Sequence, residues 1–267
     1  MKNLLYIALL AFSFSGCKKI ISIDTENAAA QIVIEGKIND RLADQQIKIA
    51  KSVGYTQASV FPAVSGATVN VTDSKGVKYV FTETSPGVYT SRMKGVYGVT
   101  YTMNVAAEGK NYTASSKMPN FVKIDSIGII NNSFFGNDVK TTAAYLVDPA
   151  DEENFYRFTL NKNGINSKGI YVNNDRLTNG NKLRIQLFFD SGSDDDDEDD
   201  LVSGDKVSVE MESIDSNIFD YWYALSGQAG RGPNQGTTPA NPTSNISNNA
   251  LGYFSANTYQ KITATVK

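Results

Sequence analysis

Apolar and polar residues alternate with a period of two along much of the first half of the chain. The alternation starts at Gln31 and recurs in short runs separated by Gly-, Pro- and Asp-containing turns. Successive side chains of a β-strand point to opposite faces, so such runs predict half-buried strands. With no amphipathic helix between them, the runs predict an Ig-like β-sandwich over residues 31–119. They are QIVIEGKI, QIKIAKS, ATVNVTD, KYVFTET, GVYTSRM, VTYTMNVAA and NYTASSK.

The second half of the chain is also predicted to consist mainly of strands, so we expect an all-β (mainly β) fold. Met118-Pro119 marks the boundary, because proline has no N–H to donate to a sheet ladder. A second β-rich domain is therefore expected over residues 120–267. It contains an acidic loop at 190–205 and a Gly-, Pro- and Asn-rich loop at 227–249. Loops this long in a compact domain are usually functional or disordered.

One short helix is expected within the second domain. The stretch from Ser213 to Asn217 offers several N-cap residues, and Gly227 stands where a C-cap is expected. Between them, apolar residues recur at the spacing of a buried helix face. These residues are Ile218, Phe219, Trp222 and Leu225.

The N-terminal residues have the pattern of an exported lipoprotein. A short basic start precedes an apolar run over residues 4–14, and Ser15, Gly16 and Cys17 follow directly. The run is shorter than the roughly 20 apolar residues of a membrane-spanning helix, which favours a signal peptide over residues 1–16. A buried N-terminal helix is disfavoured because the run has no polar face. The Ser-Gly-Cys ending resembles the lipobox of bacterial lipoproteins, and this resemblance implies acylation of Cys17.

Acylation of Cys17 would make the lipid bilayer the first partner of this protein. Each buried methylene contributes about 0.8 kcal/mol, so two or more acyl chains hold a protein stably on a membrane. Cys17 is the only cysteine, which excludes a disulfide within the chain. Residues 17–30 would then form the tether. We expect a palmitate-bearing, lipid-anchored outer-membrane protein. It could be located on the cell surface or on the periplasmic face of that membrane.

Composition narrows the function classes further. The net charge is −3, and the sequence has no basic footprint of a nucleic-acid-binding protein. The chain has no histidine, which removes Ser-His-Asp and Cys-His catalysis and the commonest ligand of zinc. We therefore expect a protein that is not an enzyme and that needs no cofactor.

A run of seven consecutive acids is a candidate calcium site, because Ca²⁺ takes about 6–8 oxygen ligands. Adjacent side chains of an extended chain point in opposing directions, however, and like charges repel, which favours a solvated loop. A third interpretation is a docking surface for a basic segment of a partner. The run consists of Asp194, Asp195, Asp196, Asp197, Glu198, Asp199 and Asp200.

The predicted helix carries an aromatic group that is a candidate stacking platform for a sugar or peptide. The spacing of Phe219 and Trp222 fits the buried face of the helix, which favours a role in the core. Tyr221 is displaced from that stripe. We therefore expect Tyr221 to be the ligand-contacting residue of the group.

The chain carries two further resemblances to known families. The segments Gly66-Ala67-Thr68-Val69-Asn70-Val71, Gly87-Val88-Tyr89 and Gly98-Val99-Thr100-Tyr101 resemble the Ig-like modules related to carboxypeptidase regulatory domains. This resemblance implies a fold and no reaction.

The second resemblance covers essentially the whole mature chain. It is carried by the segments Ile32–Ile38, Asp148-Pro149, Asn154–Phe158, Asn241-Pro242, Asn245-Ile246 and Leu251–Ala256, the last containing Leu-Gly-Tyr-Phe. These segments resemble the DUF4249 family of Bacteroidetes lipoproteins, whose genes often lie beside those of TonB-dependent outer-membrane receptors. The resemblance implies an accessory ligand-capture or partner-binding component of a TonB-dependent nutrient uptake system. The alternative is a structural or adhesive envelope lipoprotein with no small-molecule ligand.

Overall fold

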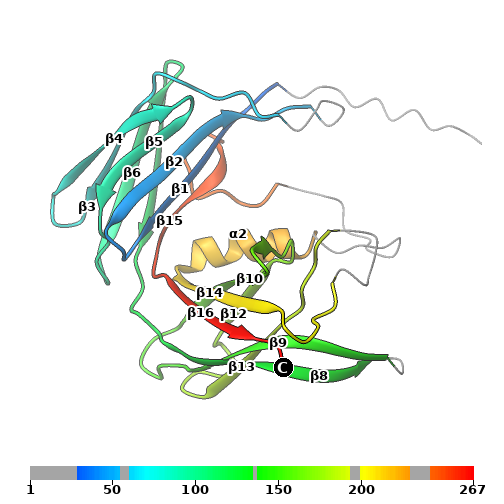
Figure 1. Cartoon of the computed structure of the whole chain (residues 1–267). Helices are drawn as coiled ribbons and strands as arrows, with labels where there is room; N and C mark the ends of the chain where they lie inside the picture. Colours follow the sequence, from blue (N-terminus) through cyan, green and yellow to red (C-terminus); the bar gives the residue numbers. More distant parts are fainter. Residues whose placement is uncertain (1–28, 55–59, 135–136, 193–198, 229–240) are drawn as a thin grey trace, which may run out of the picture.

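The computed structural model describes residues 29–54, 60–134, 137–192, 199–228 and 241–267. These residues form a mainly β structure with one helix, which confirms the fold class expected from the sequence. A sandwich occupies the upper part of Figure 1, and a second β-rich unit lies below it. Cys17 and residues 194–198 of the acidic run lie outside the described residues. No described helix has the length and apolar character needed to cross a membrane.

The N-terminal half forms the predicted β-sandwich. Its strands are β1 (Ile32–Asn39), β2 (Ala43–Lys51), β3 (Thr68–Asp73), β4 (Lys78–Ser85), β5 (Val88–Met93), β6 (Thr100–Ala107) and β7 (Lys110–Lys117). Together with the later strand β15 (Leu251–Asn257), they hydrogen-bond in the order β15-β1-β2-β5-β4-β3-β6-β7. The pairs among β1 to β7 are antiparallel.

The alternating sequence pattern explains the core of the sandwich. Ile34 and Ile38 of β1 are fully buried, while the charged residues between them face outward. Tyr89 is also fully buried, and its hydroxyl donates to the carbonyl of Val64 and accepts from the backbone N–H of Ala67, both at 2.9 Å. The tyrosine of the Gly-Val-Tyr segment thus fixes the loop that leads into β3.

The structure corrects the expected division of the chain at one point. The prediction placed all of residues 120–267 in the second domain, but β15 pairs parallel with β1 and belongs to the sandwich. Phe254 and Ala256 of β15 are fully buried in the sandwich core. Gly252 permits this pairing, because its φ is +91° and a Cβ there would lie 2.1 Å from the carbonyl oxygen of Ile34.

The second unit contains two further sheets. One runs in the order β11-β10-β14-β16, with β12 also paired to β10, and the other in the order β13-β9-β8. Their inner faces share one apolar core, which includes Tyr156, Phe158 and Leu146. The strands are β8 (Ile124–Phe134), β9 (Asn137–Val147), β10 (Phe155–Lys162), β11 (Ile165–Asn166), β12 (Tyr171–Asn174), β13 (Lys182–Leu187), β14 (Lys206–Ile214) and β16 (Gln260–Thr265).

Helix α2 (Ser216–Ser226) confirms the prediction made from its caps. Asp215 is the N-cap, and its side chain accepts from the backbone N–H of Ile218 at 3.0 Å. Gly227 is the C-cap. The helix lies between the sandwich and the lower sheets (Figure 1), and Ile218 and Phe219 are its buried residues.

Candidate functional site

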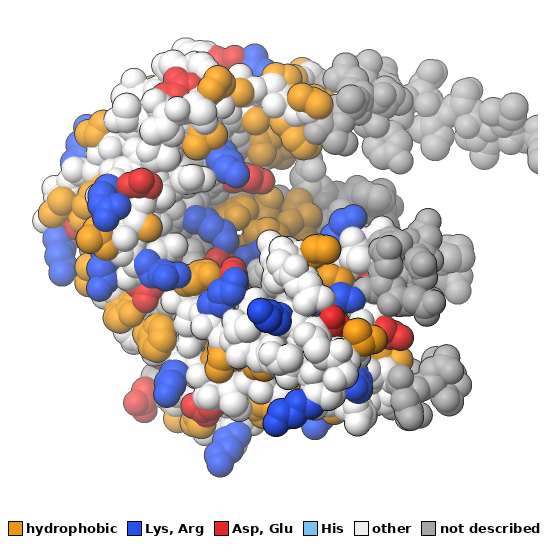
Figure 2. Space-filling model, in the orientation of Figure 1, with side chains coloured by type: hydrophobic (Ala, Val, Ile, Leu, Met, Phe, Trp, Pro, Cys, Tyr) orange, Lys and Arg blue, Asp and Glu red, His pale blue; other side chains and the backbone are white. Residues whose placement is uncertain are grey.

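The candidate site is a cleft where the sandwich faces helix α2. Figure 2 shows a hollow between the two halves of the molecule, with hydrophobic side chains on its floor and basic side chains beside it. A pocket of about 170 Å³ lies there. Strands β1, β2 and β15 supply its lining, which consists of Glu35, Lys37, Gln46, Lys48 and Tyr253.

The register of β1 and β2 creates the charged wall of this cleft. Glu35 lies opposite Lys48 in the antiparallel pair, and Lys37 lies opposite Gln46. All four side chains belong to the row that points away from the buried isoleucines, because side chains alternate along a strand. The wall therefore presents positive and negative groups side by side, a surface suited to a polar ligand or a charged partner.

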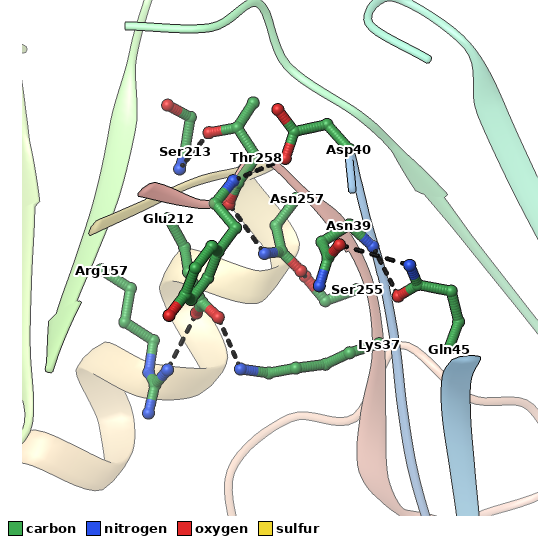
Figure 3. Close-up of polar contacts among 11 residues, drawn as sticks. Lys37, Asn39, Asp40, Gln45, Arg157, Glu212, Ser213, Ser255, Asn257 and Thr258 are labelled. Carbon is green, nitrogen blue, oxygen red and sulfur yellow. Dashed lines mark hydrogen bonds and ion pairs between the residues drawn. The ribbon is translucent and has the colours of Figure 1, made fainter. Parts of the chain in front are cut away.

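Glu212 connects this wall to the second unit. Its carboxylate accepts from Lys37 at 2.7 Å and from Arg157 at 2.8 Å (Figure 3). Arg157 lies opposite Glu212 in the antiparallel pair of β10 and β14. Burial by itself raises the pKa of Glu212, but the charges and hydrogen bonds of Lys37 and Arg157 outweigh burial and hold it below its ordinary value. Glu212 is therefore ionised and bridges the two units.

Tyr253, the aromatic residue of the pocket lining, packs against aromatic side chains of helix α2 beside this ion-pair network. The Arg157 guanidinium lies 4.0 Å from the centre of the Trp222 ring, in a cation–π arrangement. Tyr253 packs against Tyr221 at 5.0 Å and against Trp222 at 5.3 Å between ring centres. Burial raises the pKa of both tyrosines, so their hydroxyls are protonated near neutral pH.

Tyr221, the residue expected to contact a ligand, thus lies partly buried in the aromatic group of the cleft. The expected core role of Phe219 is confirmed by its burial. Trp222 is only partly buried, and Tyr223 is the most exposed of the four aromatics at 64%. Tyr223 stacks on Phe219, with 5.6 Å between ring centres.

Hydrogen bonds fix the chain where it passes from β15 to β16. The backbone N–H of Tyr259 donates to Asp40 at 2.9 Å. The backbone N–H of Ser213 donates to the Thr258 hydroxyl at 3.0 Å (Figure 3). Asn257 donates to the carbonyl of Thr258 at 2.9 Å. Because these groups are largely buried, the network holds the two walls of the cleft in a defined relation.

Several cleft residues were missed by sequence reasoning. Lys37 and Glu212 look like ordinary outward charges of strands, and Arg157 follows the same alternation. No local signal indicates that they meet, since the contact joins strands far apart in the sequence. Tyr253 falls within the Leu-Gly-Tyr-Phe segment that carries the family resemblance, and that resemblance was the one available indication.

The described part of the acidic run makes local contacts. Asp199 accepts from the backbone N–H of Ser191 at 2.7 Å, and the carbonyl of Asp200 accepts from Lys162 at 3.0 Å. Among the described residues, no three His, Cys, Asp or Glu side chains are grouped so as to hold a metal ion. The calcium interpretation of the remaining acids stays a prediction.

Comparisons with known proteins place the chain in a family. No curated protein sequence matches it. Among solved structures, it matches a two-domain fibronectin type-III segment of chicken tenascin with 13% identity and a TM-score of 0.22, over 69% of this chain and 90% of that one. That score is too low to carry an argument. The profile of the family described as "Domain of unknown function (DUF4249)" matches residues 18–263, and the chain therefore belongs to this family.

Proposed function

We propose that this protein is a non-catalytic, lipid-anchored outer-membrane protein that captures a ligand or partner in the cleft. It acts as an accessory component of a TonB-dependent nutrient uptake system in a Bacteroidetes cell. The observation that carries the proposal is the cleft itself, where a wall of mixed charge meets the aromatic group of Tyr221, Trp222 and Tyr253. The lipobox-like sequence ending at Cys17 supports the anchor.

The chemistry of the cleft favours binding over a purely structural or adhesive role. A pocket with a few convergent polar groups and aromatic surface is the usual form of a binding site. Aromatic faces offer stacking area at low entropic cost, because tyrosine and tryptophan have few rotatable bonds. Lys37 is partly exposed beside them, so the cleft offers both a flat apolar contact and a hydrogen-bond donor.

The experiment is purification of the full-length protein from its own cells in a mild detergent, followed by mass spectrometry. We expect a stoichiometric TonB-dependent receptor to accompany the wild-type protein. A Tyr253→Ala variant is expected to lose the receptor, while Val80→Ala, a change on the exposed face of β4, keeps it. Recovery of the wild-type protein alone would contradict the proposal and favour the structural role.

Acylation is tested in the same cells with a palmitate analogue. We expect label on the wild-type protein and none on Cys17→Ala, which is also expected to leave the membrane fraction. Label that persists in Cys17→Ala would contradict the anchor without bearing on the cleft.

A further inference from the structure

A second group of polar residues lies in the lower unit, at the ends of β9 and β12. Asp148 directly follows β9, Asp175 directly follows β12, and Asn154 directly precedes β10. All three are at least nine-tenths buried, with exposed fractions of 2%, 1% and 3%. The carboxylates of Asp148 and Asp175 lie within hydrogen-bonding reach of each other.

The hydrogen bonds of this group leave two oxygens without a donor. Asp148 accepts from the Tyr156 hydroxyl at 2.5 Å and from the backbone N–H of Gly180 at 3.1 Å. One oxygen of Asp175 accepts from the backbone N–H of Asn154 at 2.9 Å. The other oxygen, Oδ1, has no partner, and neither has Oδ1 of Asn154. Buried acceptor oxygens without a partner are rare and costly, so these two oxygens require either a hydrogen-bond donor or a cation.

Among the described residues, no basic side chain neutralises these carboxylates. Within the described residues, neither Asp148 nor Asp175 forms an ion pair with a lysine or arginine. Arg176, the nearest basic residue in sequence, pairs with Glu153 at the surface. Two adjacent buried carboxylates repel each other strongly when both are ionised, so either a cation or a shared proton must neutralise one charge.

We propose that Asp148, Asp175 and Asn154 form a binding site for a divalent cation of the calcium type. Ca²⁺ binds carboxylate, amide and backbone carbonyl oxygens in a flexible geometry, and it needs no histidine or cysteine. The two oxygens that lack donors, Asp175 Oδ1 and Asn154 Oδ1, are ligands of this kind. The two carboxylates of Asp148 and Asp175 together carry a charge of −2 when both are ionised, and one divalent ion neutralises that charge.

The site has a structural consequence, because its residues belong to both sheets of the lower unit. Asp148 extends from β9 in one sheet, whereas Asn154 and Asp175 flank β10 and β12 in the other. Backbone bonds already hold the loops together, from Asp148 to Asn181 at 3.0 Å and from Asp175 to Asn154 at 3.2 Å. A cation bound by these three residues would connect the two sheets at one end of the lower unit.

The test measures calcium binding to the full-length protein after treatment with a chelator. We expect about one tightly bound Ca²⁺ per chain by equilibrium dialysis, and a rise in melting temperature when calcium is added. The control variant replaces the seven acids of residues 194–200 with their amides. It is expected to keep both effects, which separates this site from the acidic run.

Two variants address the proposed ligands. Asp175→Asn is expected to abolish tight binding and the rise in melting temperature. Tyr156→Phe removes the hydroxyl that orients Asp148, and we expect about a 10- to 100-fold loss of affinity. If Asp175→Asn does not fold, calcium binding to the acidic-run variant tests the proposal by itself. One tightly bound Ca²⁺ per chain of that variant supports the site.

The opposing result has a clear form. If the two carboxylates share a proton, the wild-type protein and the acidic-run variant bind no calcium tightly. Asp175→Asn, which mimics the protonated acid, then has a melting temperature equal to or above that of the wild type near neutral pH. Either finding would overturn the proposal.

Discussion

Lys37 and Glu212 are 175 positions apart in the sequence, yet their side chains meet at 2.7 Å across the junction of the two units. Glu212 is shared with Arg157, which in turn lies over the Trp222 ring. This chain of contacts connects β1 of the sandwich to the helix that borders the cleft. The ion pair therefore serves both the stability of the junction and the shape of the candidate site.

The two ends of this ion pair are expected to differ in their effect on stability. Glu212→Ala leaves Arg157 without its carboxylate in a largely buried position, which costs about 3–5 kcal/mol. The Lys37 side chain is 37% exposed, so water replaces much of its interaction, and Lys37→Ala should cost no more than about 1 kcal/mol. Urea unfolding of both variants measures the difference. Equal losses would contradict the bridging role of Glu212.

Acid should weaken the same junction. The folded-state pKa of Glu212 is held below its ordinary value of 4.5. A carboxyl group of this kind contributes stability above its unfolded-state pKa and loses that contribution as the pH falls through the folded-state pKa. We expect the unfolding free energy of the wild type to decrease as the pH drops below about 4.5. The unfolding free energy of Glu212→Gln is expected to decrease less over the same range. Parallel pH profiles would contradict this assignment.

Gly252 offers a test of the parallel pairing between β15 and β1. Gly252→Ala forces a left-handed backbone on alanine and brings its Cβ against the carbonyl of Ile34. Gly109→Ala is the matched control, because Gly109 has a similar φ of +75° but nothing within 4 Å. Strain at φ alone costs about 1–2 kcal/mol. We expect the Gly252 variant to lose clearly more in melting temperature, and equal losses would argue against the pairing.

The parts of the fold that follow from local patterns could be predicted from the sequence. Helix α2 was expected between N-cap candidates at residues 213–217 and a C-cap at Gly227, because capping chemistry acts over a few residues. Ile34 and Ile38 were expected in a strand core because apolar and polar residues alternate around them. Each signal lies within a single element, so no tertiary information was needed to interpret it.

The parts that depend on distant contacts were not predictable in this way. The alternation of apolar and polar residues in β15 does not indicate which strand it pairs with. The pairing with β1 was therefore not predicted, and the strand that contains Tyr253 was placed in the wrong unit. Tyr221 was selected for its position on the helix, but its contact with Tyr253 required the fold. Asp148 was noted as part of a segment that carries the family resemblance, and nothing in its sequence surroundings indicates that Asp175 lies beside it.

The most direct test of the proposed function is site-specific photo-crosslinking in living cells. A photoreactive amino acid replaces Gln46 in the cleft wall or, as control, Val80 on β4, which is 64% exposed and lies away from the cleft. We predict that the Gln46 position forms a reproducible adduct with a TonB-dependent receptor or with its cargo, and that the Val80 position does not. An absence of adducts at Gln46, or equal adducts at both positions, would contradict the role of the cleft.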